Sequence, residues 1–378
     1  MCFQGSFDFQ LALSQSKIFW STWTKALKPS NNSPVVHLYD RFKSPVTAKI
    51  DGMSVVPSFE ATPEQRELLV IYNRADRIFR RIVTSGALTS LILLGLIGTF
   101  LFVRSAQIFN DRGLRFITGS NWTAGSGDGV IPDDFSIGPM LTGTILVSVI
   151  ALVIAMPIAI CGALYIEFYA AARLRKLLST LLDLAAAIPS LIFGLWGVVL
   201  FTSFGERWSI FLNSRLGWVP FIKVQAEVFG RSPFVAGCVL ASLITPIITS
   251  VSREVFSRTP RDLIDTCYAL GSTRWGSIKT VVLPFGRSGV IGGAMLGLGR
   301  ALGETVAVYL LLNIVFRYNF RILESEGGNI ASLIALKFGE ATEYELKALV
   351  AAGFVLFLLT LVVNMVAATI VEKSTRRK

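Results

Sequence analysis

The chain has 378 residues, of which 52% are hydrophobic and 16% are charged, and its mean hydropathy is +0.60. Soluble domains rarely carry that much apolar weight, so the composition argues against a soluble domain and indicates a membrane protein. The formal net charge of +11 does not indicate a nucleic-acid partner, because the charges cluster between the apolar runs, as is typical of membrane topology.

Residues 1–81 are polar, with scattered aromatic residues and prolines, and we expect them to be a cytoplasmic extension. Residues 64–81 can form a basic amphipathic helix on the inner membrane surface. A disordered tail, or a start codon placed too early with Met53 as the true start, is favoured over a folded regulatory domain. His37 is the only histidine, and the four cysteines show no metal-like or redox-like spacing. We therefore expect no catalytic and no metal-binding residues.

Six apolar stretches are long enough to cross a bilayer, which takes about 20 helical residues. They cover residues 82–103, 141–166, 177–201, 234–251, 290–316 and 348–371. The predicted fold is an all-α membrane protein with six transmembrane helices. Its expected sections are a first helix with an external loop over residues 82–140, a core over residues 141–372, and a basic tail over residues 373–378.

Prolines fall inside three of the spans and are expected to kink them, as in transporters more than in passive anchors. These prolines are Pro157, Pro189 and Pro246. The orientation follows from Lys and Arg, which number 24 in the segments placed inside and 11 in those placed outside when the N-terminus is inside. Both termini are therefore predicted to be cytoplasmic, in the inner membrane of the cell.

The segment over residues 253–288, between the fourth and fifth spans, has the pattern of two short helices. Thr259 and Pro260 mark a capped start, and Gly271 is placed to end the first helix in a turn with positive φ. A second helix is expected over residues 273–283, with Pro284 as its stop. The first helix carries an apolar stripe made of Leu263, Ile264, Cys267 and Leu270. Such a helix either packs on its own spans or enters a groove of a partner protein.

This segment resembles the EAA loop of binding-protein-dependent importer permeases. The matching positions are Asp265, Thr266, Cys267, Gly271, Leu283 and Pro284. Asp-Thr-Cys replaces Glu-Ala-Ala, while the glycine and the Leu-Pro pair keep the family's spacing. The resemblance implies that the loop docks into an ATPase subunit. Because the chain contains no Gly-x-x-x-x-Gly-Lys-Ser/Thr loop, it is not expected to be an enzyme or to bind a cofactor, and ATP would be bound by the partner.

The fifth span carries two charges, Arg300 and Glu304, and a series of glycines. Gly289, Gly293 and Gly297 lie four apart, as do Gly299 and Gly303, a spacing that lets helices approach closely. Arg300 and Glu304 would share one helix face, turned away from lipid. The residues alone leave two interpretations equally open: a structural ion pair, or a guanidinium that contacts an oxyanion.

Residues 297–308 resemble the signature of phosphate-specific transport permeases of the PstC type, and residues 138–148, 187–190 and 271–284 agree with it. The resemblance implies a MetI-like core and a phosphate pathway at Arg300, Glu304 and Thr305. It also implies a complex with two ATPase copies, a second permease of the PstA type and an extracytoplasmic phosphate-binding protein. The alternatives are a sulfate or molybdate permease, or an ATP-independent carrier or scaffold.

Overall fold

The computed structural model describes residues 74–125, 133–224 and 229–376. His37, Met53 and most of the predicted amphipathic helix over residues 64–81 lie outside these ranges. Residues 74–81 belong to a long continuous helix, α3 (Arg74–Arg112). The side chains of the predicted basic tail over residues 373–378 likewise lie outside the described ones.

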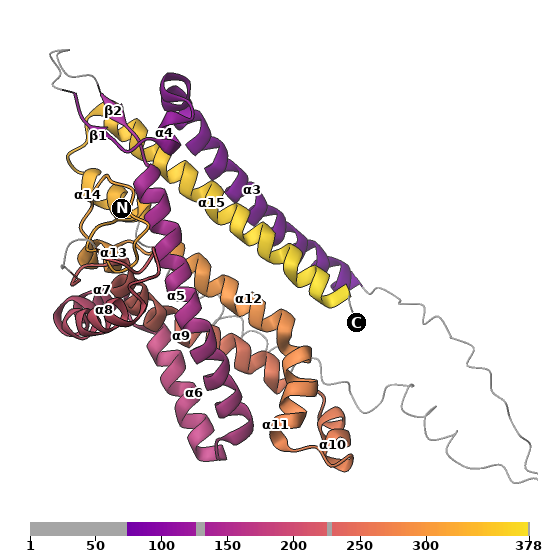
Figure 1. Ribbon diagram of the computed structural model, residues 1–378. Coiled ribbons are helices and arrows are strands. Elements are labelled where there is room, and N and C mark those ends of the chain that lie inside the picture. Colours follow the sequence, from indigo (N-terminus) through magenta and orange to yellow (C-terminus); the bar gives the residue numbers. More distant parts are fainter. Residues whose placement is uncertain (1–73, 126–132, 225–228, 377–378) are drawn as a thin grey trace, which may run out of the picture. The chain divides into compact units, whose positions relative to one another are not determined.

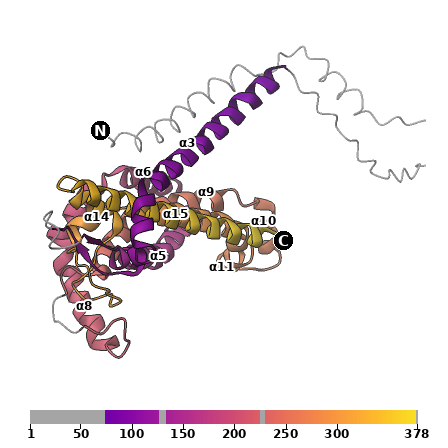
Figure 2. The same ribbon diagram turned by 90° about the horizontal axis from the view of Figure 1, so that it is seen from above.

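The first and sixth predicted spans lie side by side in α3 and α15 (Glu343–Arg376) (Figure 1). The rings of Phe102 and Phe354 lie 5.7 Å apart between the two helices. The first turns of α3, up to Leu96, are exposed along their length (Figure 2). After α3 come α4 (Arg115–Thr118) and the antiparallel strands β1 (Trp122–Thr123) and β2 (Asp134–Phe135). Side chains of α4 and β2 pack in one apolar cluster with those of α14 (Ile330–Lys337) and the first turns of α15.

The centre of the fold consists of α5 (Gly138–Leu164), α9 (Pro233–Ser257) and α12 (Leu283–Leu302). The spacing of the glycines in α12 allows the close helix approach that the sequence predicts, and the neighbouring helix is α9. Side chains added at Gly289, Gly293 and Gly297 would all meet side chains of α9, and at Gly297 the added Cβ would lie 2.8 Å from Ile248 Cδ1. The prediction of a glycine seam is therefore confirmed for these three. Gly299 and Gly303 meet no neighbouring helix within 4 Å in the described part of the chain.

The third predicted span, residues 177–201, is not one straight helix. It divides into α6 (Ala172–Ala187) and α7 (Ser190–Trp196), and α7 continues through the π-helical turn η2 (Gly197–Phe201) into α8 (Thr202–Leu216). The two parts are bent by 92°. Pro189 explains the break, since it donates no backbone hydrogen bond and forces Ile188 into an extended conformation, with ψ at 131°.

The fifth predicted span, residues 290–316, was predicted too long. The helix ends at Leu302, and a short helix, α13 (Val306–Leu311), follows a non-helical break over residues 303–305. Three glycines within seven residues weaken the helix there, because glycine is among the poorest helix formers. Within the described ranges, five helices are long and apolar enough to cross a membrane, and the bent pair would make a sixth. The class of multi-pass, all-α membrane protein is therefore confirmed.

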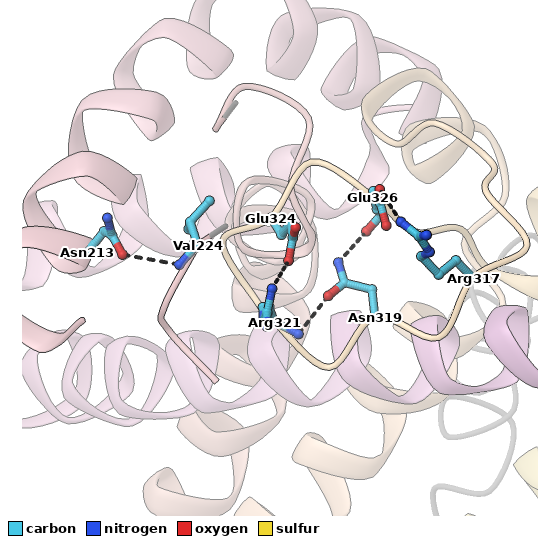
Figure 3. Close-up of polar contacts among 7 residues, drawn as sticks. All are labelled: Asn213, Val224, Arg317, Asn319, Arg321, Glu324 and Glu326. Carbon is cyan, nitrogen blue, oxygen red and sulfur yellow. Dashed lines mark hydrogen bonds and ion pairs between the residues drawn. The ribbon is translucent and has the colours of Figure 1, made fainter. Parts of the chain in front are cut away.

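The loop between α13 and α14 is held by its own polar side chains (Figure 3). Arg321 forms an ion pair with Glu324 at 3.1 Å, and Arg317 one with Glu326 at 3.8 Å. Asn319 joins the two, because its amide donates to the Glu326 carbonyl at 2.9 Å and accepts from the Arg321 backbone N–H at 2.7 Å. The loop is thus a defined structure that carries the chain from the break to α14.

Candidate functional site

Arg300 lies in the last turn of α12, where the helix dipole favours a positive charge. Its side chain is half-buried. The Nε–H group of the guanidinium is fully buried and has no hydrogen-bond partner among the described residues. Leaving a buried donor unsatisfied costs about 1–3 kcal/mol, and more when the group is charged. The position therefore suits an acceptor that the described residues do not supply.

Glu304 does not lie on the face of α12 that carries Arg300, as the sequence analysis predicted, because the helix has already ended. The residue is only 7% exposed. Its carboxylate accepts a hydrogen bond from the Ala307 backbone N–H at 3.3 Å, at the start of α13. Among the ion pairs of the described residues there is none between Arg300 and Glu304. No contact in the described part of the chain therefore supports the interpretation of a structural ion pair between Arg300 and Glu304.

Thr305, the third predicted pathway residue, is the residue that precedes α13. Its hydroxyl donates to the Gly303 carbonyl at 3.2 Å, which holds the break in a turn. The structure thus brings Arg300, Glu304 and Thr305 together around one helix break, although not in the arrangement that a continuous helix would give.

Two residues that the sequence analysis missed hold this break in place. The Asn329 side-chain amide donates to the Glu304 carbonyl at 2.6 Å, and its oxygen accepts from the Ser332 backbone N–H at 2.8 Å. The Thr144 hydroxyl accepts from the Ile330 backbone N–H at 3.1 Å. These bonds tie the break to α14 and α5. Asn329 followed by Ser332 ahead of an apolar run is a capping-box signal that the sequence does contain.

The predicted helix–turn–helix forms a second candidate site at the other end of α12. Its first helix is α10 (Arg261–Ala269), and the turn after it contains Gly271 at φ +81°, as predicted. Thr273 caps α11 (Arg274–Ser277), because its hydroxyl accepts from the Gly276 backbone N–H at 3.1 Å. We call residues 261–277 the coupling hairpin.

Two details of the hairpin prediction are wrong. Thr259 does not cap α10: the cap residue is Pro260, and the Thr259 hydroxyl is buried without a partner in the described part of the chain. Pro284 does not stop a helix either. It lies in the first turn of α12, directly after the π-helical turn η3 (Ile278–Val282). The wider π-helical turn tolerates a residue that has no backbone N–H to donate, so the helix continues through Pro284.

The coupling hairpin leaves large apolar side chains exposed. Leu263 is 50%, Trp275 57% and Leu270 83% exposed. Ile264 and Leu283 instead pack on an apolar cluster at the ends of α5 and α9. The other predicted coupling residues follow the same division: Asp265, Thr266, Gly271 and Pro284 are exposed, and Cys267 is half-buried. The hairpin is thus anchored on one side and offers an apolar surface on the other, which suits a partner protein.

Within the described ranges, no group of three or more His, Cys, Asp or Glu residues is placed to hold a metal ion. The two sites present groups that can bind partners. The break can present a guanidinium donor to an anion, and the coupling hairpin can present apolar side chains to a protein.

Comparison with known proteins gives a consistent result. A family model described as binding-protein-dependent transport system inner membrane component matches residues 155–377. The phosphate transport system permease protein PstC of Mycobacterium leprae is 42% identical over 304 residues, which cover 79% of this chain and 94% of that protein. The protein of the same name from Xylella fastidiosa is 36% identical over 328 residues, 86% of this chain and 98% of that protein. A solved bacterial ABC transporter involved in the import of the acidic polysaccharide alginate aligns at 19% identity with a TM-score of 0.47, covering 79% of this chain and 99% of that chain.

Proposed function

This chain belongs to the family of binding-protein-dependent transport system inner membrane components, and we propose that it is the permease subunit of an ATP-driven importer of inorganic phosphate. The observation that carries the substrate class is the buried, unpartnered Nε–H of Arg300 beside a helix break. A planar guanidinium can hold two oxygens of a tetrahedral oxyanion, which makes phosphate a fitting acceptor. Glu304 and Thr305 lie in the same break and hold it by hydrogen bonds to the backbone of Ala307 and Gly303.

The partners follow from the coupling hairpin and from the proposed transport cycle. The exposed apolar side chains of the hairpin would dock into an ATPase subunit, present in two copies, which binds the ATP; this chain needs no cofactor of its own. A second permease of the PstA type and an extracytoplasmic phosphate-binding protein complete the complex. Asp265, Thr266, Cys267, Gly271, Leu283 and Pro284 are the positions that we assign to coupling.

The orientation that we propose places both termini and the coupling hairpin in the cytoplasm. The excess of Lys and Arg in those segments supports it. The external loop within residues 82–140 and the loop of Figure 3 would then face outward, where the binding protein arrives. Tags at the termini and in the hairpin should be protected in right-side-out vesicles. Labelling of the hairpin from outside would overturn the orientation and the docking together.

The function is tested by purifying the assembled complex and measuring ATP hydrolysis with the binding protein and one oxyanion at a time. We expect phosphate to stimulate hydrolysis, with sulfate and molybdate as matched controls. Stimulation by sulfate or molybdate alone would assign the chain to the other oxyanion permeases. Phosphate uptake without any co-purified ATPase would favour an ATP-independent carrier and overturn the proposal.

A further inference from the structure

An acidic residue, Asp183, lies in the first helix of the bent pair that is the sixth candidate membrane span. It lies on α6, about 16 Å along the helix axis from Ala172 at 1.5 Å per residue. Its side chain is exposed. The surrounding surface of α6 is apolar, because Leu177, Leu181 and Leu184 are 56%, 49% and 63% exposed. A carboxylate therefore interrupts a surface that otherwise suits lipid or a protein partner.

The contacts of this carboxylate with the described residues leave its charge uncompensated. The Ser250 hydroxyl, on α9, donates to Asp183 Oδ1 at 3.3 Å. No ion pair involves Asp183 among the described residues. A single hydroxyl donor does not replace the water that an ionised carboxylate loses in a membrane. No described residue of this chain neutralises the charge.

Lipid cannot meet it, because ionisable side chains within membrane spans almost always face the protein interior, a partner charge or water. Two environments remain: a second subunit or an aqueous path. An exposed carboxylate along a phosphate path would repel the cargo, unlike Glu304, which is buried and accepts a hydrogen bond from the Ala307 backbone N–H. A cation supplied by a second subunit therefore accounts better for Asp183. Thr180 is exposed one turn earlier on the same face of α6, which extends the polar surface toward that subunit.

We propose that the face of α6 and α9 around Asp183 packs against the second permease subunit, and that Asp183 pairs there with a Lys or Arg side chain of that subunit. The inference rests on the proposed function, which supplies a second permease. Ser250 orients the carboxylate from within this chain, while the pair sets the register of the two permeases. Removing one member of such a buried pair leaves the other charge without a partner, which is strongly destabilising.

The test uses the full complex and measures how much second permease co-purifies with this chain. Asp183→Asn keeps the oxygen that accepts from Ser250 but removes the charge, and we expect roughly 100-fold or more weaker association of the two permeases. Ser250→Ala is the matched control, which removes the internal hydrogen bond and should associate nearly normally. Unchanged association of the Asp183→Asn variant would overturn the inference.

A proximity measurement covers the case in which the charge variant fails to insert. In a background without the native cysteines, Thr180→Cys carrying a photo-crosslinker should cross-link to the second permease, whereas Leu270→Cys on the coupling hairpin, which is proposed to face the ATPase, should not. Rapid modification of the Thr180→Cys variant by a membrane-impermeant maleimide, without cross-linking, would place this face in water and overturn the inference. If wild-type complex contains no second permease, the proposed function itself fails, which is a separable result.

Discussion

The two ends of α12 differ in what they lack. At its start, the Thr273 hydroxyl caps the second short helix of the coupling hairpin. The hairpin nevertheless leaves Leu263, Leu270 and Trp275 exposed to solvent or a partner. At its end, the break buries Glu304, whose carboxylate accepts from one backbone N–H, yet it leaves Arg300 Nε without an acceptor among the described residues. The exposed side chains at the start of α12 suit an apolar protein surface, and the guanidinium at its end suits an anion. A helix that joins two such ends can link ATPase docking to movement of an anion.

The largest effect should come from the anion end. Arg300→Gln removes the guanidinium, and losing a charged hydrogen bond of about 3 kcal/mol should lower phosphate uptake roughly 100-fold. Arg300→Lys keeps the charge but loses the planar fork, so partial uptake is expected. The measurement is phosphate uptake normalised to assembled complex.

The double variant Arg300→Gln with Glu304→Gln sharpens this prediction. Because Glu304 bonds to the Ala307 backbone and not to Arg300, neutralising both charges should not restore uptake. Substantial rescue would show that the two charges balance each other and would remove the contrast between the two ends of the helix.

The coupling end should be sensitive to loss of its apolar surface. Leu270→Ser removes a side chain that is 83% exposed in this chain, so the chain should insert normally. If the ATPase buries that leucine, its loss costs about 2 kcal/mol and weakens ATPase binding roughly 30-fold. Leu114→Ser, at a residue 80% exposed just after α3, is the control and should bind the ATPase normally. Equal binding by both variants would contradict the docking role.

A smaller effect is expected from the turn of the hairpin. Gly271 has φ +81° and no atom within 4 Å of an added Cβ, so a substitution acts only through the backbone. A β-branched residue in that conformation costs about 1–2 kcal/mol, and Gly271→Val should weaken ATPase association about tenfold. Gly271→Asn should retain it, because asparagine tolerates positive φ. Wild-type uptake by the valine variant would show that the turn does not couple.

The same contrast shows what the sequence could and could not predict. Spans covered by α3, α5, α9 and α15 were predictable because uninterrupted apolar runs identify them. Gly271 was predictable because the requirement for positive φ is local. The bend at Pro189 was predictable in kind, because a proline inside a span kinks its helix, although its size of 92° was not. The break at Gly303 was not predictable, because hydropathy does not register backbone geometry.

The errors at the site have separate causes. The four-residue spacing of Arg300 and Glu304 implies a common face only if the helix continues, and it ends at Leu302. Asp183 was overlooked because one charge hardly changes the mean hydropathy of a long apolar run. Asn329 carried a readable capping signal, but its bond to Glu304 depends on tertiary structure that spacing does not reveal.

The smallest effect concerns the body of α12 between its two ends. A methyl group at Gly289 would lie within 2.8 Å of Val255 Cβ, and valine is stiff at χ1, so α9 and α12 must separate slightly. Gly292, nearly one turn away, meets no atom within 4 Å. Gly289→Ala should therefore lower the Tm of the purified chain by about 3 °C per kcal/mol of overpacking, whereas Gly292→Ala should leave it unchanged or raise it, since alanine is the better helix former. Equal losses in both variants would mean that α9 and α12 do not meet along the glycine seam. A Gly292→Ala variant that is stable alone but fails to assemble would instead place that open face of α12 against another subunit.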